Sequence, residues 1–324
     1  MTKKPVKIIL DMDPGHDDAV AMMLAWAHPR IDLQAITVVA GNQTLEKTTR
    51  NALNVATALG VTGVPVAAGM SGPMVRPQVI ADDIHGITGL DGPTFGEPSV
   101  SLDSRHAVQL IIEILMNSAG DITLVPTGPL SNIAMAMRLE PRIMEKIERI
   151  VLMGGSYQLG NITPAAEFNI FADPEAAHVV FSSGRPLVMM GLDLTRQAKV
   201  FPSVVERMRE VHNPVSLLFV ELMEFFAKTQ KEVFGWEGPP LHDPTTVAWL
   251  IDPTLIKTKP MAVEVELRGE HTYGRTCCDY FGMTRKAPNA EVALKLDTER
   301  FWDLIHHTLK LYDHLPCPGC KNSD

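Results

Sequence analysis

Four carboxylates lie within eight residues near the start of the chain, directly after the apolar run 8–10. They belong to Asp11, Asp13, Asp17 and Asp18, and a Pro-Gly pair stands between the second and the third. Carboxylates repel one another, so placing them together at the end of a buried strand is costly unless a cation lies between them. A hard divalent ion such as Ca²⁺ or Mg²⁺ prefers such oxygen ligands. The segment therefore predicts a metal site.

The alternative interpretation of this segment is an ordinary helix start. Asp17 and Asp18 would then favour the positive end of the helix dipole. This alternative leaves Asp11 and Asp13 unexplained.

Composition narrows the class of protein. The chain has 324 residues, 45% of them hydrophobic, and a net charge of −9. This is enough apolar material for a sizeable core, and the acidic balance argues against nucleic acid or an anionic membrane as a partner. Only a few apolar residues follow Lys3 and Lys4, and no run of about 18 apolar residues occurs elsewhere. We therefore expect a cytoplasmic protein.

The four cysteines do not form a disulfide scaffold in a chain of this length. Cys317 and Cys320 make a lone CxxC motif, which lacks the second ligand pair of a structural zinc site. Residues 315–324 are expected to be a flexible tail, with a labile redox pair as the alternative.

Short apolar runs alternate with helical patterns over residues 1–314, without a linker or repeat. This pattern predicts one α/β domain with a mostly parallel central sheet, helices on both faces and inserted active-site loops at 68–104 and 156–169. The expected strands are 6–10, 33–40, 122–126, 150–153 and 187–190. Segments 261–267 and 291–296 alternate like edge or antiparallel strands. The expected helices are 19–28, 46–59, 106–119, 174–182, 203–212, 215–228, 244–251 and 298–312.

In such a fold, ligands bind beyond the carboxyl ends of the strands. Polar residues follow each predicted strand, and the fold would gather them on one rim, which also includes the carboxylates of 11–18: Asn42, Thr127, Asn161, Glu167, Asn169, Asp193 and Thr195. This rim is rich in carboxylates and amides and lacks Lys or Arg. It suits a cation and a neutral polyol rather than phosphate.

Several of these residues also have a purely structural interpretation. Asp173 precedes a proline and is expected to cap a helix. Asp243 also precedes a proline, so the sequence leaves open whether it caps the helix 244–251 or binds a metal. Lone histidines are more often structural than catalytic, which applies to His16, His85 and His242. His85 lies in a segment that resembles a mobile flap.

Together the motifs resemble the inosine–uridine-preferring nucleoside hydrolase family, with the bacterial pyrimidine-preferring ribonucleoside hydrolases as the nearest group. Segment 11–18 reads DMDPGHDD and matches the specific DxDxGxDD core of that family. The other matching segments follow in family order: 40–44, 126–132, 153–155, 164–170, 173–177 and 242–244. The resemblance implies a Rossmann-like nucleoside hydrolase fold.

The resemblance also implies roles for individual residues. One Ca²⁺ per subunit would be held by Asp13, Asp18, the backbone carbonyl of Thr127, and Asp243. The ribose would be bound by Asp17, Asn42, Asn161, Glu167 and Asn169. His242 and Gln230 would face the base, and His85 and Met153 would complete the substrate pocket. Asp11 is expected to support the loop without binding the ion.

The implied reaction is calcium-dependent hydrolysis of the N-glycosidic bond of a nucleoside to ribose and free base, through an oxocarbenium-like transition state. Asp13 is the expected base toward a metal-activated water, and His242 is expected to assist the leaving base, with His85 as a second contributor. A small nucleoside is the expected partner, and the chain is expected to form a homodimer or homotetramer.

Two other classes of function remain as alternatives. An Asp-x-Asp phosphohydrolase would normally carry Thr or Val where this chain has Gly15, and would need a basic phosphate clamp. A non-catalytic nucleoside-binding protein is the other alternative.

The expected base preference is for uridine and cytidine. It follows from the resemblance, from Gln230 and His242, and from the lack of an evident aromatic stacking pair that would suit a purine. Phe234 departs from the family, because related enzymes often carry a Tyr after this glutamine.

Overall fold

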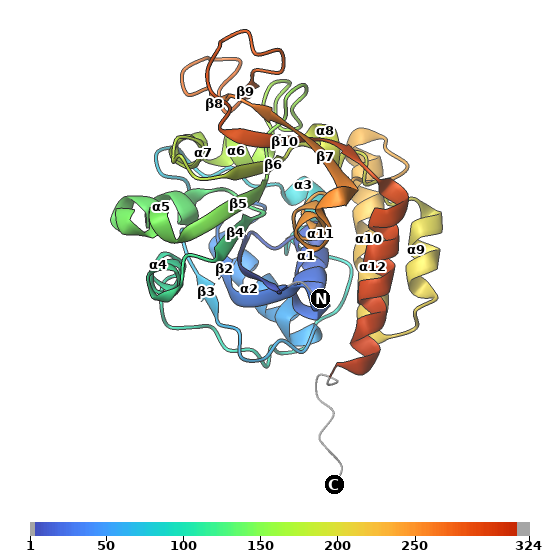
Figure 1. Cartoon of the computed structure of the whole chain (residues 1–324). Helices are drawn as coiled ribbons and strands as arrows, with labels where there is room; N and C mark the ends of the chain where they lie inside the picture. Colours follow the sequence, from blue (N-terminus) through green and yellow to red (C-terminus); the bar gives the residue numbers. More distant parts are fainter. Residues whose placement is uncertain (1–3, 316–324) are drawn as a thin grey trace.

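An eight-stranded sheet runs through the middle of the molecule (Figure 1). The computed structural model describes residues 4–315, apart from the side chains of Asp82 and Asp83; the CxxC motif at 317–320 and the rest of the predicted tail lie outside this range. The sheet order is β3 (Val66–Ala68), β2 (Ile31–Val38), β1 (Val6–Met12), β4 (Ile122–Pro126), β5 (Ile147–Met153), β6 (Leu187–Met190), β10 (Ala290–Leu296) and β7 (Ile256–Met261). Neighbouring strands are parallel except β10 and β7.

Helices cover both faces of this sheet, because successive side chains of a strand point to opposite faces. In β1, Ile8 and Leu10 belong to one buried cluster and Ile9 to the other. The first cluster is completed by α1 (His16–Ala27), α2 (Leu45–Ala58), α9 (Pro202–Arg209), α10 (Pro214–Phe234), α11 (Pro244–Ile251) and α12 (Thr298–Leu311). The second is completed by α4 (Ala107–Asn117), α5 (Ser131–Leu139) and α7 (Pro174–Phe181). The predicted fold class is confirmed.

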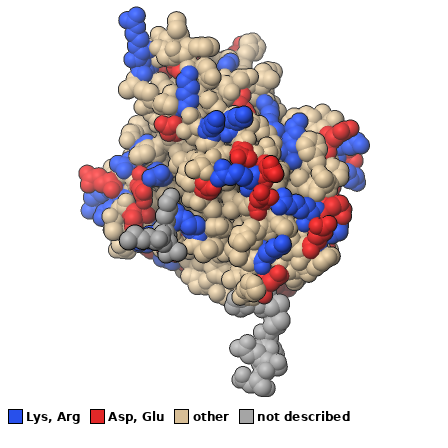
Figure 2. All heavy atoms as spheres, turned by 45° about the vertical axis from the view of Figure 1, so that its right-hand side comes forward, with Lys and Arg blue, Asp and Glu red and all other residues tan. Residues whose placement is uncertain are grey.

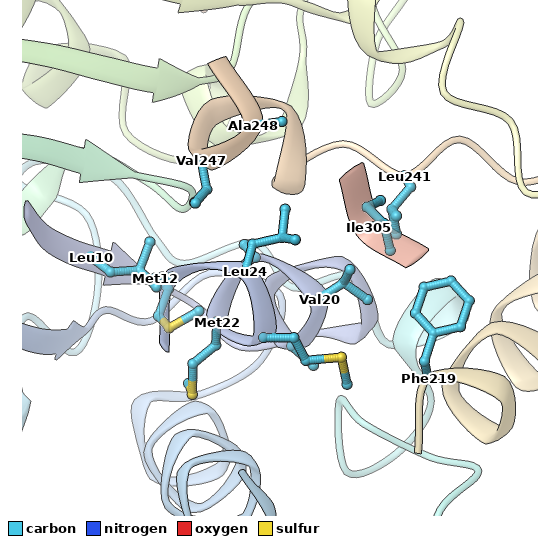
Figure 3. Close-up of a cluster of buried hydrophobic side chains, with 14 of the residues drawn as sticks. Leu10, Met12, Val20, Met22, Leu24, Phe219, Leu241, Val247, Ala248 and Ile305 are labelled. Carbon is cyan, nitrogen blue, oxygen red and sulfur yellow. The ribbon is translucent and has the colours of Figure 1, made fainter. Parts of the chain in front are cut away.

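Helix α1 is enclosed by the core, and its residues 16–25 are all buried. Figure 3 shows Val20, Met22 and Leu24 of this helix between β1 and side chains of the surrounding helices, among them Phe219 of α10 and Val247 of α11. Full burial of each such apolar side chain contributes about 1.5–3 kcal/mol. The start of α1, which carries Asp17 and Asp18, is therefore held rigidly at the end of β1.

The structure differs from the predicted elements mainly in the last third of the sheet. A single strand over 261–267 is wrong: β7 ends at Met261, and β8 (Val263–Val265) pairs with β9 (Thr276–Cys278) in a separate two-stranded sheet. The strand expected over 291–296 lies inside the sheet, parallel to β6 and antiparallel to β7. β3, β7 and β9 were not predicted as strands.

Five helices also differ from expectation. Helix α5 was not predicted, and the short helices α3 (Asp82–His85), α6 (Phe168–Ala172) and α8 (Leu192–Thr195) lie in segments expected to be loops. Helix α10 continues beyond residue 228 to Phe234 and ends at Gly235, whose φ of 70° favours glycine. Gln230 and Phe234 therefore lie on one rigid helix.

Charged side chains of both signs are interspersed on the face shown in Figure 2. Ion pairs such as Arg209–Glu224 and Arg207–Asp303 join α9 to α10 and α12. Exposed pairs of this kind contribute little to stability, and this face carries no large patch of one sign.

Among residues 4–315, no helix combines the length and apolar character needed to cross a membrane.

Candidate active site

A cavity of about 300 Å³ lies at the carboxyl end of the sheet. From β1 the chain proceeds outward to β2 and β3, whereas β4, β5 and β6 extend on the other side of β1 (Figure 1). The loops that leave β1 and β4 therefore diverge, and a crevice forms between them. Every residue given a catalytic, substrate-binding or calcium-binding role lines this cavity except Asp13 and Asp18, which are buried next to it. Asp193 and Thr195, also expected on the rim, do not line it.

Three carboxylates converge at the floor of the cavity. Asp17, Asp18 and Asp243 each offer one oxygen atom, and these atoms lie within 4.8 Å of one another. Asp243 stands at the start of α11, but its side chain makes no capping hydrogen bond. The capping alternative for Asp243 is therefore wrong. Asp18 does act partly as a helix-start residue, because its Oδ2 accepts a hydrogen bond from the Gly15 amide at 2.9 Å.

Asp13 lies beside this cluster and is held on one side only. Its Oδ2 accepts a hydrogen bond from the Asn42 amide at 2.7 Å, whereas its buried Oδ1 has no partner among the described residues. A side chain on Gly41 or Gly128 would collide with the Asp13 carboxylate. These two glycines therefore make the room in which this carboxylate sits.

Asp11 is outside the cluster of converging carboxylates. Its Oδ1 accepts hydrogen bonds from Thr37 Oγ1 at 2.6 Å and Asn132 Nδ2 at 2.8 Å. These bonds tie β1 to β2 and to α5, and burial raises the pKa of Asp11 to about 7. This arrangement agrees with a supporting role.

Burial and mutual repulsion make it difficult for these carboxyl groups to be ionised together. Burial, with the charge of Asp18 added, raises the pKa of Asp17 to about 7, and burial raises that of Asp18 to about 6. The pKa values of Asp13 and Asp243 are raised well above their usual range for the same reasons. No Lys or Arg of the described chain forms an ion pair with any of the four. An oxygen-only cluster with an unpartnered Oδ1 beside it fits a hard divalent cation.

Backbone groups orient the side chains predicted to bind ribose. The buried Glu167 carboxylate accepts hydrogen bonds from the amides of Gly155 (2.8 Å), Asn169 (2.8 Å) and Ile170 (3.1 Å), and so caps α6. Burial raises its pKa to about 7. Asn169 Nδ2 donates to the Thr127 carbonyl at 2.6 Å, which ties α6 to the end of β4.

Asn161 and Met153 complete this side of the cavity. Asn161 Oδ1 accepts a hydrogen bond from the Phe168 amide at 2.9 Å. The Met153 sulfur lies 3.4 Å from Asn169 Nδ2. The structure thus brings the predicted ribose-binding residues together in the lining of one cavity.

The residues expected to face the base line the same cavity. His242 Nδ1 lies 2.7 Å from Thr195 Oγ1, and burial and the charge of Arg196 lower its pKa to about 3, so the ring is neutral. His85 packs its ring against Phe226, and burial lowers its pKa well below the usual range. Gln230 is buried, and its Oε1 has no hydrogen-bond partner within residues 4–315.

Two features of the cavity were missed or misjudged from the sequence. The expectation of a rim without Lys or Arg is wrong, because Arg196 lines the cavity. An aromatic pair also exists: Phe234 and Trp236 line the cavity with ring centroids 4.7 Å apart and planes 20° from parallel. Arg196 could have been found, since it directly follows Thr195 on the predicted rim. Trp236 could not, because its position depends on where α10 ends.

Comparisons with known proteins agree with this geometry. The profile of the family described as "Inosine-uridine preferring nucleoside hydrolase" matches residues 8–303. Proteins named pyrimidine-specific ribonucleoside hydrolase RihB, from Escherichia coli and Shigella flexneri, are 56% identical over 306 residues, which cover 94% of this chain and 97% of theirs. Among solved structures, the purine-preferring ribonucleoside hydrolase from Gardnerella vaginalis superposes with a TM-score of 0.89 at 32% identity, over 95% of this chain and 100% of that one. A plant nucleoside hydrolase superposes with a TM-score of 0.86 at 30% identity, over 94% and 99%.

Proposed function

Because the chain belongs to the inosine-uridine preferring nucleoside hydrolase family and is a ribonucleoside hydrolase, we propose that it is a calcium-dependent enzyme that prefers pyrimidine nucleosides. The observation that carries the metal dependence is the convergence of Asp17, Asp18 and Asp243 at the cavity floor without a paired cationic side chain among the described residues. Family membership also leaves the phosphohydrolase and the non-catalytic binding protein without support.

The proposed calcium ligands are Asp13, Asp18, the Thr127 carbonyl and Asp243. Asp17 converges with two of them, so it is proposed to contact both the ion and the ribose. A bound calcium ion would offset the repulsion between the carboxylates and make a water molecule easier to deprotonate. The unpartnered Oδ1 of Asp13 supports its place in this set.

In the proposed mechanism, side chains of the cavity bind the ribose, accept a proton from water and stabilise the transition state. Asp17, Asn42, Asn161, Glu167 and Asn169 bind the ribose hydroxyls. Asp13 accepts the proton of the attacking water. The anionic floor stabilises the positive charge that develops on the ribose in the oxocarbenium-like transition state.

Departure of the base is assisted from the other side of the cavity. His242 uses Nδ1 for Thr195, so its Nε2 is the atom proposed to form a hydrogen bond with the leaving base. His85 is proposed as a second contact. Gln230 Oε1 lacks a donor, and the N3–H of uracil or the amino group of cytosine would supply one.

The preference for pyrimidines rests on the 56% identity to proteins named pyrimidine-specific and on Gln230. The fold alone does not decide the preference, because a purine-preferring relative shares it. The Phe234–Trp236 pair offers a flat apolar surface that either kind of base can contact.

One experiment tests the two parts of the proposal separately. Release of reducing sugar from uridine, cytidine and inosine is measured with the purified protein, after exhaustive chelation and after adding Ca²⁺ back. We expect loss and recovery of turnover, and a higher kcat/KM for uridine than for inosine. Full activity in verified metal-free protein would exclude the calcium mechanism, whereas a higher kcat/KM for inosine would exclude only the base preference. The homodimer or homotetramer and the cytoplasmic location also stay predictions, and light scattering and cell fractionation test them.

A further inference from the structure

The turn that follows β6 contacts both the loop after β5 and His242. The Leu192 amide donates to the Gly155 carbonyl at 2.9 Å, and Asp193 Oδ2 accepts from the Tyr157 amide at 2.7 Å. Two residues later, Thr195 Oγ1 lies 2.7 Å from Nδ1 of His242. The short helix α8 therefore joins the loop after β5, which leads to Asn161, to the histidine on the base side.

Arg196 extends these contacts to the far end of the same loop. Its guanidinium nitrogens donate to the carbonyls of Leu159 at 3.2 Å and Gly160 at 2.7 Å. The Asn161 amide then donates to the Ala166 carbonyl at 3.0 Å, which closes a tight turn. The planar fork of an arginine suits two neighbouring acceptors better than a lysine ammonium does.

The position of this arginine is unexpected on electrostatic grounds. The reaction builds positive charge on the ribose, so a cation lining the cavity opposes it. Two carboxylates, those of Glu167 and Asp193, lie close enough to act on the Arg196 charge. These carboxylates reduce the electrostatic cost of a cation near the ribose. The stabilisation gained by holding the loop would offset the remaining cost.

We propose that Arg196 is a positioning residue, which fixes residues 155–161 so that Asn161 and Glu167 meet the ribose in the correct place. It acts through the loop and does not touch the reacting atoms. The kinetic part of this inference rests on the proposed nucleoside hydrolysis. The structural part does not.

The structural test is hydrogen exchange in Arg196→Gln and Arg196→Lys, with Arg185→Gln as the matched control. Arg185 is a partly buried arginine that also donates to a backbone carbonyl, that of Ile147 at 2.6 Å, but at the opposite end of the sheet. We expect the amides of Tyr157 and Asn161 to exchange at least about tenfold faster in Arg196→Gln, since local opening becomes easier. The lysine variant should be intermediate and the control unchanged. Unchanged exchange at the two amides in Arg196→Gln would overturn the inference, whatever base the enzyme prefers.

The kinetic test compares uridine with p-nitrophenyl riboside, which share the ribose and differ in the leaving group. Misplaced ribose contacts should lower kcat/KM by about 10- to 100-fold for both substrates alike. A loss confined to uridine would place Arg196 on the base side with His242, and no loss for either substrate would also overturn the inference. If Arg196→Gln does not fold, Arg196→Lys carries both tests, with the same outcomes deciding.

Discussion

Replacing Asp243 by Asn tests whether Asp243 is a metal ligand or a helix cap. The two roles predict opposite changes in the stability of the metal-free protein. The Asp243 side chain makes no capping hydrogen bond, so the variant should not incur the loss of about 1 kcal/mol typical of a removed cap. It does remove one of three carboxylates that converge within 4.8 Å. In metal-free protein this change relieves repulsion and should stabilise the fold.

The size of the effect follows from the geometry. At 4.8 Å, the upper limit of the separation between these oxygen atoms, two unit charges repel by roughly 3.5 kcal/mol at an effective dielectric constant of about 20. Partial protonation relieves some of this in the wild type, so we expect a gain of about 1–3 kcal/mol, or about 1.5–4.5 °C in Tm for a chain of this size. With calcium at about 100 times its Kd, the wild type instead gains about 2.7 kcal/mol from binding, most of which the variant should lose.

The assay is thermal unfolding of both proteins in EDTA and in Ca²⁺. Asp243→Asn should melt above the wild type in EDTA and below it in Ca²⁺. Asp173→Asn is the matched control: Asp173 Oδ1 caps α7 through the Ala176 amide, and its Oδ2 accepts from Met74 and Ser131. An Asn there loses one acceptor, so its Tm should fall equally in both buffers. A fall of Asp243→Asn in both buffers would refute the reasoning.

Three further predictions concern catalysis. Asp13→Asn should lose nearly all turnover, whereas Asp11→Asn should be milder; equal losses of kcat/KM, with calcium still bound in the Asp11 variant, would contradict the roles assigned to them. His242→Ala should slow hydrolysis of uridine far more than that of p-nitrophenyl riboside, whose leaving group needs no assistance, and an equal drop would assign His242 to ribose binding or folding. Gln230→Met should lower kcat/KM for uridine by about 3- to 10-fold, the usual contribution of one hydrogen bond. It should not lower Tm, because Gln230 Oε1 has no hydrogen-bond partner among the described residues to lose. A lower Tm would instead assign Gln230 a structural role.

The sequence predicted the interior of the sheet better than its edges. Runs such as 8–10 and 187–190 are continuously apolar because both faces of their strands are buried. The edge strand β7 reads IKTKPM and is mostly exposed or half-buried, and β3 has only three residues. Neither carries a pattern that identifies a strand, since edge strands tolerate charge and proline.

Site residues that directly follow strands were predictable for the same reason. Asp17, Asn42 and Thr127 line the cavity because parallel strands end at the same edge. The role of Asp243 was not predictable from spacing, because a carboxylate before Pro244 suits a cap as well as an ion until its orientation is known. Trp236 reaches the cavity only because α10 ends at Gly235, a tertiary detail.

The separation between the floor of the cavity and its outer wall has a consequence for how substrate range evolves. The carboxylates stand on strand ends and on buried helix starts, where most substitutions would disturb the core. The outer wall is built from Ile80, Ala81 and Ile84 and from the last turn of α10, where Val233 and Phe234 are partly exposed. Substitutions in this outer wall should change which bases fit the cavity, while the carboxylates at its floor stay unchanged. A library confined to Ile80, Ala81, Ile84 and residues 230–236 is therefore the economical route to variants with new base specificity.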